Sequence, residues 1–502
     1  MLDTFCFLHY YISGDSMKSK RILAFILAIL AVVLMSAPII SFAAVSTGEG
    51  EATLLQEGEF DIATGESVHY ATLRSVSDTV AESVYNGLLA YADKIDVSAL
   101  LCSVDEFDAY YSNIINDNPD LFFVSSSYQY YYSKVTGKVT AVVPQYAMSQ
   151  EEVENAMTVF NAGAERALSE VDDTMSDLQK ALTIHDYICS YAVYPQIYDA
   201  NGNYSSALDL DIYHSAYGFF KDYNAVCAGY TLTFSYLMKQ LGIECEYVSS
   251  GDMEHAWNKI KIDGNWYNID ITYDNADFIE AENTYGLAYH DCFLKSDSYF
   301  QSENGLYHYN YATYDDCAAN NTVFDSYFWD DVNSRIYTVE GNYYYLNPNY
   351  ASQTAVLTKR TLSGTESALG SSMRAPTLSI TRYANDSSGT QHQIPHSEIL
   401  TRLCYLDGKF YLNDYQNIYA VYPNGTQRTA FSGTGYLISL GTERGELLYQ
   451  TYHNQSNVIT IDKSEYFKNS LVQYHLYPDV NNDGVVNGRD WGYIVQQATL
   501  NY

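Results

Sequence analysis

Residues 255–274 read HAWNKIKIDGNWYNIDITYD. Asp263-Gly264 is a strong signal for a two-residue turn, and it lies between two segments in which apolar and polar residues alternate. This pattern predicts a β-hairpin in which Ile262 pairs with Asn265.

The same register can be followed to the open end of the hairpin. It places Trp257 opposite Asp270, and His255 shares a face with Trp257 because side chains alternate along a strand. Asp270 is then the diagonal cross-strand neighbour of His255, with Cβ atoms about 7–8 Å apart. The sequence therefore predicts that the Asp270 carboxylate can orient the imidazole of His255.

A thiol precedes this hairpin, in the stretch AVCAGY at 225–230. Apolar residues follow Cys227 on one helical stripe, which predicts a helix that begins near the thiol: Tyr230, Phe234, Leu237, Met238 and Leu241. The positive end of a helix lowers a thiol pKa, and its backbone N–H groups can bind an oxyanion. A cysteine, a histidine or an aspartate alone has an ordinary structural explanation, but the set is that of a thiol nucleophile, a base and its orienter.

The segment from Leu178 to Asp297 resembles the transglutaminase-like superfamily of papain-fold cysteine enzymes. The resemblance rests on ordered motifs: HDYI (185–188), VCAGY (226–230), HAWN (255–258), GNWYN (264–268), DITYD (270–274) and FLKSD (293–297). It implies that Cys227 is the nucleophile, His255 the general base and acid, and Asp270 the orienter. One departure is Ile271, which stands where a proline is common in the family. Tyr217 is a candidate oxyanion donor, with core packing as the competing interpretation.

The expected reaction is attack of the Cys227 thiolate on an amide carbonyl of a protein or peptide, followed by transfer of the acyl group from a thioester. Water as acceptor gives a peptidase or amidase, and an amine as acceptor gives a transglutaminase. A cross-linking enzyme needs a dry tunnel for its amine, for which Trp257 and Trp266 are available, although both also fit the core of the hairpin. The sequence leaves this choice open.

The fold class expected for the chain is α+β: a papain-like, transglutaminase-like core with a helical N-terminal region, a β-rich meander module and a C-terminal EF-hand-like calcium loop. The expected domains are an N-terminal α+β region at 67–170, the catalytic domain at 171–300 and the β-rich accessory module at 325–462. In that module the predicted turns are Gly341-Asn342, Asp407-Gly408 and Asn424-Gly425. Similarity between 335–346 and 404–421 indicates repeated meanders, and the Ser/Thr/Gly-rich stretch 361–396 is expected to be a loop or linker.

The N-terminal segment has the pattern of a secretory signal peptide at 17–43. A basic stretch at 17–21 precedes an apolar stretch at 22–35, and Ser41-Phe42-Ala43 fits a cleavage site. The chain is therefore expected to be secreted, with Met17 as the true start and an uncleaved anchor as the alternative. No later stretch is long and apolar enough to span a bilayer.

The C-terminal stretch DVNNDGVVNGRD at 479–490 has the ligand spacing of an EF-hand-like calcium loop. Gly484 makes the sharp turn, and the expected Ca²⁺ ligands are Asp479, Asn481, Asp483, Val485 through its carbonyl, Asn487 and Asp490. The stretch resembles one half of a type I dockerin, which implies binding to a cohesin on a cellulosome-like cell-surface scaffold. Dockerins carry two such repeats and one is visible here, so a lone calcium staple is the alternative.

The composition excludes some partners. The formal net charge of −35 argues against nucleic acid and anionic membranes. Seven cysteines follow Cys6 at wide, unpatterned spacings, which indicates reduced core cysteines and one reactive thiol. The expected function is a secreted cysteine-dependent acyl-transfer enzyme. The alternatives are a non-catalytic binding protein that keeps the fold and a scaffold adaptor without chemistry.

Overall fold

The computed structural model describes residues 60–66, 78–195, 211–275, 286–311 and 317–474, the last range with short gaps at 376, 400, 433–435, 444–445, 456–457 and 469. The predicted signal peptide and the predicted calcium loop lie outside the described residues. Among the helices that are described, none combines the length and the hydropathy that crossing a bilayer requires.

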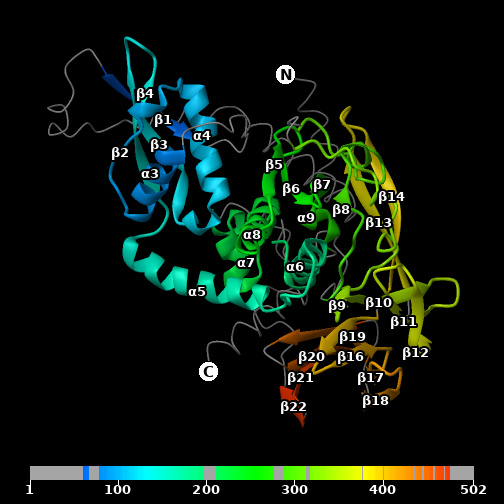
Figure 1. Ribbon diagram of the computed structural model, residues 1–502. Helices are drawn as coiled ribbons and strands as arrows, with labels where there is room; N and C mark the ends of the chain where they lie inside the picture. The colour runs from blue at the N-terminus through cyan, green and yellow to red at the C-terminus, as the bar shows by residue number, and fades with distance from the viewer. Residues whose placement is uncertain are drawn as a thin grey trace, which may run out of the picture. The chain divides into compact units, whose positions relative to one another are not determined.

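The N-terminal part is a four-stranded antiparallel sheet, in the order β1-β3-β4-β2, accompanied by two helices (Figure 1). Helix α4 begins with a capping box in which Ser103 and Glu106 satisfy each other's backbone N–H groups, and it ends just before Pro119. Helices and strands occur together in this region, and the strand pair β3–β4 turns at Gly137, whose φ is 67°. Its elements are β1 (Phe60–Glu66), α3 (Asp78–Leu89), β2 (Ile95–Asp96), α4 (Val104–Asp117), β3 (Val124–Ser133) and β4 (Val139–Tyr146).

A layer of helices follows. Serine caps at Ser149 and Ser176 fix where α5 and α6 begin, each in a capping box. Helix α8 begins at Cys227, as its apolar stripe predicts, and ends before Gly242, which adopts a φ of 74°. The helices are α5 (Gln150–Leu168), α6 (Asp177–Tyr191), α7 (Ala216–Asp222) and α8 (Cys227–Gln240).

The central sheet is antiparallel, in the order β5-β6-β7-β8, and α8 packs against β5 and β6 (Figure 1). Ile262 pairs with Asn265, which confirms the predicted hairpin register. Asp263 and Gly264 both have positive φ, 49° and 79°, as the tight turn requires. The elements of this part are β5 (Cys245–Ser250), β6 (His255–Ile262), β7 (Asn265–Ile269), α9 (Ile271–Asp274), β8 (Phe293–Lys295) and α10 (Asp297–Phe300).

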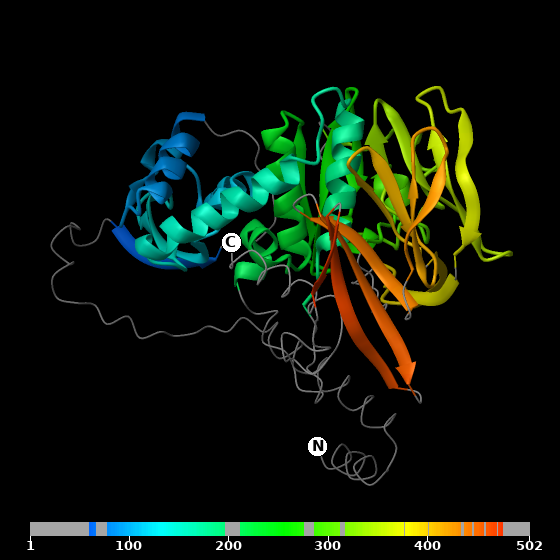
Figure 2. The same cartoon turned by 90° about the horizontal axis from the view of Figure 1, so that it is seen from below.

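The C-terminal part is built from consecutive antiparallel strands. Three four-stranded meanders and one hairpin follow one another along the chain, coloured from yellow-green to red in Figure 2. The first meander is β9 (Tyr337–Val339), β10 (Asn342–Asn349), β11 (Thr354–Arg360) and β12 (Glu366–Arg374), and the hairpin is β13 (Thr377–Asn385) and β14 (Gln391–Ile399). The second meander is β15 (Leu403–Leu406), β16 (Lys409–Asn413), β17 (Asn417–Val421) and β18 (Gln427–Ser432), and the third is β19 (Tyr436–Glu443), β20 (Glu446–Gln455), β21 (Val458–Lys468) and β22 (Ser470–Tyr474). The prediction of repeated meanders is confirmed.

The prediction of a loop or linker at 361–396 is wrong. Most of this stretch forms β12, which pairs antiparallel with β11 with one shift of register, and β13 and β14, which pair antiparallel with each other. Its strands are rich in serine and threonine because much of their surface is open to solvent, and Tyr383 is 60% exposed. The first turn of the module is also displaced by one residue, because Glu340 and Gly341 are the residues with positive φ.

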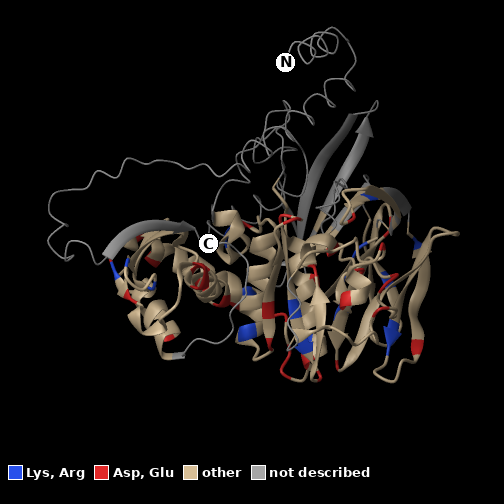
Figure 3. Cartoon of the chain, turned by 90° about the horizontal axis from the view of Figure 1, so that it is seen from above, with Lys and Arg blue, Asp and Glu red and all other residues tan. Residues whose placement is uncertain are grey.

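Charged and thiol side chains are spread over the described elements. Figure 3 shows the positions of Lys and Arg scattered among those of Asp and Glu along the described elements. All seven cysteines after Cys6 are unpaired, as the sequence indicates. Four of them are buried, and Cys102, Cys227 and Cys245 are partly exposed.

Candidate active site

Cys227, His255 and Asp270 each stand at the end of an element of the central layer. Cys227 is the first residue of α8, His255 is the first residue of β6, and Asp270 joins β7 to α9. Asp270 is the N-cap of α9, because its Oδ1 accepts a hydrogen bond from the Tyr273 N–H at 3.1 Å. This cap fixes the carboxylate while its other oxygen faces the hairpin.

The Asp270 carboxylate holds the imidazole of His255 as the hairpin register predicts. His255 Nε2 lies 2.6 Å from Asp270 Oδ2. His255 also hydrogen-bonds the thiol of Cys227. Because Nε2 of His255 contacts Asp270, the hydrogen bond to the thiol is made by Nδ1. The structure thus brings together the three residues that the sequence analysis singled out.

Burial and charge act in opposite directions on this imidazole. Burial alone would lower the pKa of His255, but the charge of the Asp270 carboxylate, with the hydrogen bonds that His255 makes to Asp270 and Cys227, raises it to about 10. His255 in turn, together with His308, holds the pKa of Asp270 well below its usual range despite the burial of that carboxyl. The site therefore favours an imidazolium ion next to the thiol at neutral pH.

His308 is a second imidazole on the same carboxylate, and sequence reasoning missed it. Its Nε2 lies 2.9 Å from Asp270 Oδ2, and its Nδ1 donates to the carbonyl of Gly305 at 2.6 Å. Burial lowers the pKa of His308. The ring also packs edge-on against Trp257, with centroids 4.7 Å apart. No motif surrounds His308, so the only signal was its presence as one of few histidines after the hairpin.

Tyr194 is the tyrosine next to the nucleophile. Its hydroxyl accepts a hydrogen bond from the backbone N–H of Cys227, and burial followed by the charge of Cys227 raises its pKa above the usual range. Tyr217, the predicted oxyanion candidate, instead packs in the core, where its ring stacks on Phe122 with centroids 4.5 Å apart. The contacts of Tyr217 thus fit the competing packing interpretation.

Both hairpin tryptophans are core side chains. Trp257 is 1% exposed and packs beside His255, with ring centroids 5.8 Å apart. Trp266 is 8% exposed and packs against Cys317 and Ala319. Neither ring is therefore free to form the wall of an open channel.

Two described clusters bring three possible metal ligands within 4.8 Å of one another. One consists of His255, Asp270 and His308 of this site, and the other of His185, Asp186 and His290. The predicted calcium ligands at 479–490 fall outside the described residues.

One comparison with known proteins covers the part of the chain that carries this site. Residues 165–271 match the family model described as "Transglutaminase-like superfamily". A solved structure titled "Crystal structure of a TGase" is similar at 15% identity, over 27% of this chain and 41% of that one, with a TM-score of 0.20. The comparison with curated proteins gave no match. We conclude that residues 165–271, which include Cys227, His255 and Asp270, are a transglutaminase-like domain.

Proposed function

We propose that this chain is a cysteine-dependent acyl-transfer enzyme that acts on amide bonds of proteins or peptides. Cys227 is the nucleophile, His255 the general base and acid, and Asp270 the orienter of His255. The observation that carries the proposal is the imidazole of His255, which is held by Asp270 at 2.6 Å and hydrogen-bonded to the Cys227 thiol.

Each residue of the set has one task in the proposed reaction. With the Cys227 proton already held on His255 Nδ1, the thiolate attacks the amide carbonyl carbon, and the carbonyl oxygen becomes an oxyanion at the start of α8. The imidazolium then gives its proton to the leaving amine, and a thioester to Cys227 remains. A water or amine acceptor attacks the thioester, His255 takes the acceptor's proton, and the thiolate is released. Asp270 keeps its charge throughout and stabilises the imidazolium.

The buried tryptophans support water as the acceptor. An enzyme that selects an amine must keep water away from the thioester, and Trp257 and Trp266 were the residues in the sequence suited to wall such a path. Both are packed in the interior. We therefore propose a peptidase or amidase in preference to a cross-linking enzyme.

A single incubation separates the two acceptors. We expect that the purified chain, given a glutamine-containing peptide and a labelled primary amine, will cleave or deamidate the peptide without incorporating the label. Mass spectrometry of the peptide distinguishes the three products, and Cys227→Ala serves as the blank. Incorporation of the amine would overturn the preference for water but keep the thiol mechanism. Absence of all three products, together with no labelling of Cys227 by a thiol-directed acyl probe, would contradict the enzymatic proposal.

We further propose that the chain is secreted through the segment at 17–43 and binds Ca²⁺ at 479–490, where it would attach to a cohesin. The support is the spacing of Asp479, Asp483 and Asp490 around Gly484. Asp479→Ala is expected to lower the calcium affinity of the full chain at least about tenfold, because it removes a charged ligand. Titration calorimetry with Ca²⁺ measures this, with Asp414→Ala, away from the loop, as control. Equal calcium affinity in both variants would contradict calcium binding at 479–490. Calcium binding without cohesin binding would contradict the attachment to a cohesin and leave the calcium site as proposed.

A further inference from the structure

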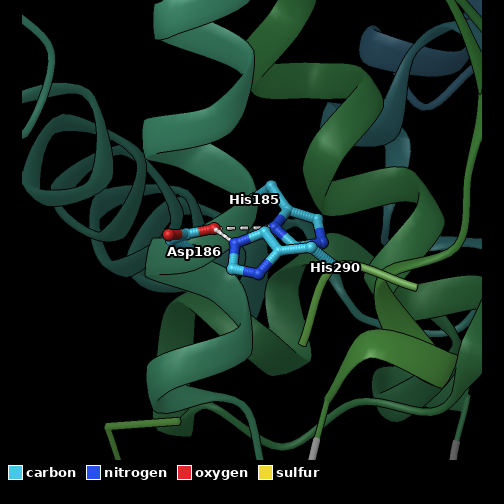
Figure 4. A group of neighbouring side chains, drawn as sticks. All are labelled: His185, Asp186 and His290. Carbon is cyan, nitrogen blue, oxygen red and sulfur yellow. Dashed lines mark hydrogen bonds and ion pairs between the residues drawn. The ribbon is translucent and has the colours of Figure 1, made fainter. Parts of the chain in front are cut away.

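We propose that His185, Asp186 and His290 bind one divalent transition metal ion, with zinc the best match to the ligand set. None of these three residues belongs to the proposed catalytic set of Cys227, His255 and Asp270. His185 and Asp186 are neighbours on α6, and His290 comes from the segment that precedes β8. Figure 4 shows both rings directed at the same oxygen of the Asp186 carboxylate.

Three ligand atoms converge in this cluster. His185 Nδ1 lies 2.8 Å and His290 Nε2 lies 3.0 Å from the same atom, Asp186 Oδ1. The side chains of all three residues are fully buried. Two imidazole nitrogens and a carboxylate oxygen form a ligand set that zinc and related metals bind in proteins.

The remaining polar atom of each of these side chains is held by the protein. His185 Nε2 lies 3.1 Å from Asp274 Oδ2, and His290 Nδ1 donates to the Val332 carbonyl at 2.8 Å. Asp186 Oδ2 accepts the backbone N–H of Ile336 at 2.6 Å. Metal-binding histidines characteristically donate their other N–H to a carboxylate or a carbonyl, which fixes the ring and its tautomer. All three side chains show this outer arrangement.

These outer hydrogen bonds leave three hydrogen-bond acceptors facing one another at the centre of the cluster. With each ring N–H directed outward, His185 Nδ1 and His290 Nε2 present lone pairs to the carboxylate oxygen between them. Such a buried centre requires added positive charge, which one divalent cation or two extra protons would supply. A dication is balanced by Asp186 and Asp274, and it needs no proton on either inner nitrogen. It would join α6 to the segment around His290 and to Ile336, ahead of β9.

The metal content of the full chain tests the proposal. The chain is produced with zinc in the medium, passed through a chelating resin, and measured for metals by plasma mass spectrometry. We expect about one equivalent of a transition metal per chain, counted separately from calcium. Less than about a tenth of an equivalent would overturn the proposal, as would the same melting temperature before and after removal of the metal with a strong chelator.

Two matched variants locate the metal. In His290→Gln the metal content is expected to fall at least about tenfold, because one of three ligands is lost. His308→Gln is the control, since His308 also donates Nδ1–H to a backbone carbonyl and directs Nε2 at an aspartate. The content of His308→Gln is expected to match that of the unmodified chain. Loss of metal with His308→Gln and its retention with His290→Gln would overturn the assignment.

Cobalt substitution of the unmodified chain gives a readout that does not depend on the folding of a variant. Cobalt in a site of two histidines and one aspartate is expected to show visible ligand-field bands without a thiolate charge-transfer band. A thiolate band would place the metal on a cysteine and overturn the proposal.

Discussion

Cys227→Ala is expected to lower kcat/KM for amide substrates by about 10⁴–10⁶-fold, because removal of the nucleophile from a catalytic set removes nearly all its chemical contribution. The substitution deletes one partly exposed sulfur atom and leaves the first turn of α8 and the central hairpin intact. The fold is therefore expected to persist. Steady-state kinetics measures the loss, and circular dichroism with thermal unfolding confirms the fold.

Two other cysteines provide matched controls for this result. Cys102 is partly exposed like Cys227 but lies in the N-terminal part of the chain. Cys189 lies 3.7 Å from His185 Nε2, so it also has an imidazole neighbour, but burial raises the pKa of its thiol to about 11. Cys102→Ala and Cys189→Ala are expected to keep kcat/KM close to that of the unmodified chain. Full activity of Cys227→Ala would contradict the role of Cys227 as the nucleophile and would favour the interpretation of the chain as a non-catalytic binding protein.

Asp270→Asn is expected to lower kcat by about 10³–10⁴-fold and to move the alkaline limit of the activity to lower pH. In the folded chain the pKa of His255 is raised to about 10, so the imidazolium that protonates the leaving amine persists until the pH rises through that value. Without the carboxylate, burial is left as the main influence and lowers the pKa of His255. The imidazolium is then lost at a lower pH. The pH dependence of kcat and of Cys227 alkylation by iodoacetamide measures both effects.

The control for this substitution lies on the same hairpin. Asp263→Asn makes the same chemical change at the exposed tip, where Asn tolerates the positive φ of 49°. Its pH profile is expected to match that of the unmodified chain. Identical alkaline limits in Asp270→Asn and Asp263→Asn would show that Asp270 does not set the charge of His255.

The meeting of His255 and Asp270 could be predicted because it depends on local rules. A two-residue turn defines the register of the hairpin, and the alternation of side chains defines the shared face. The start of α8 at Cys227 follows from its apolar stripe in the same way. Local rules do not predict that Cys227 on α8 meets His255 on the hairpin. That contact was inferred from the kinds of residue present and from the family resemblance.

The residues that sequence reasoning missed depend on long-range packing. His308 contacts Asp270 although the two residues are 38 positions apart in the sequence. Leu306 and Tyr307, which precede His308, both have positive φ, and no local sequence pattern predicts this course of the backbone. Tyr194 reaches Cys227 in a similar way. The sequence of 361–396 predicts a loop in place of strands because hydrophobic periodicity does not indicate a strand that is largely exposed on both faces, as β12 is.

The turn at Asp263-Gly264 places a constraint on how this protein can change over generations. Surface turns normally accept insertions and deletions, and nothing lies within 4 Å of a Cβ built on Gly264. One added residue that slipped the pairing of β6 and β7 would, however, carry Asp270 to the opposite side of the sheet from His255. The length of this turn is therefore expected to be inherited unchanged even while the identities of the residues in it drift.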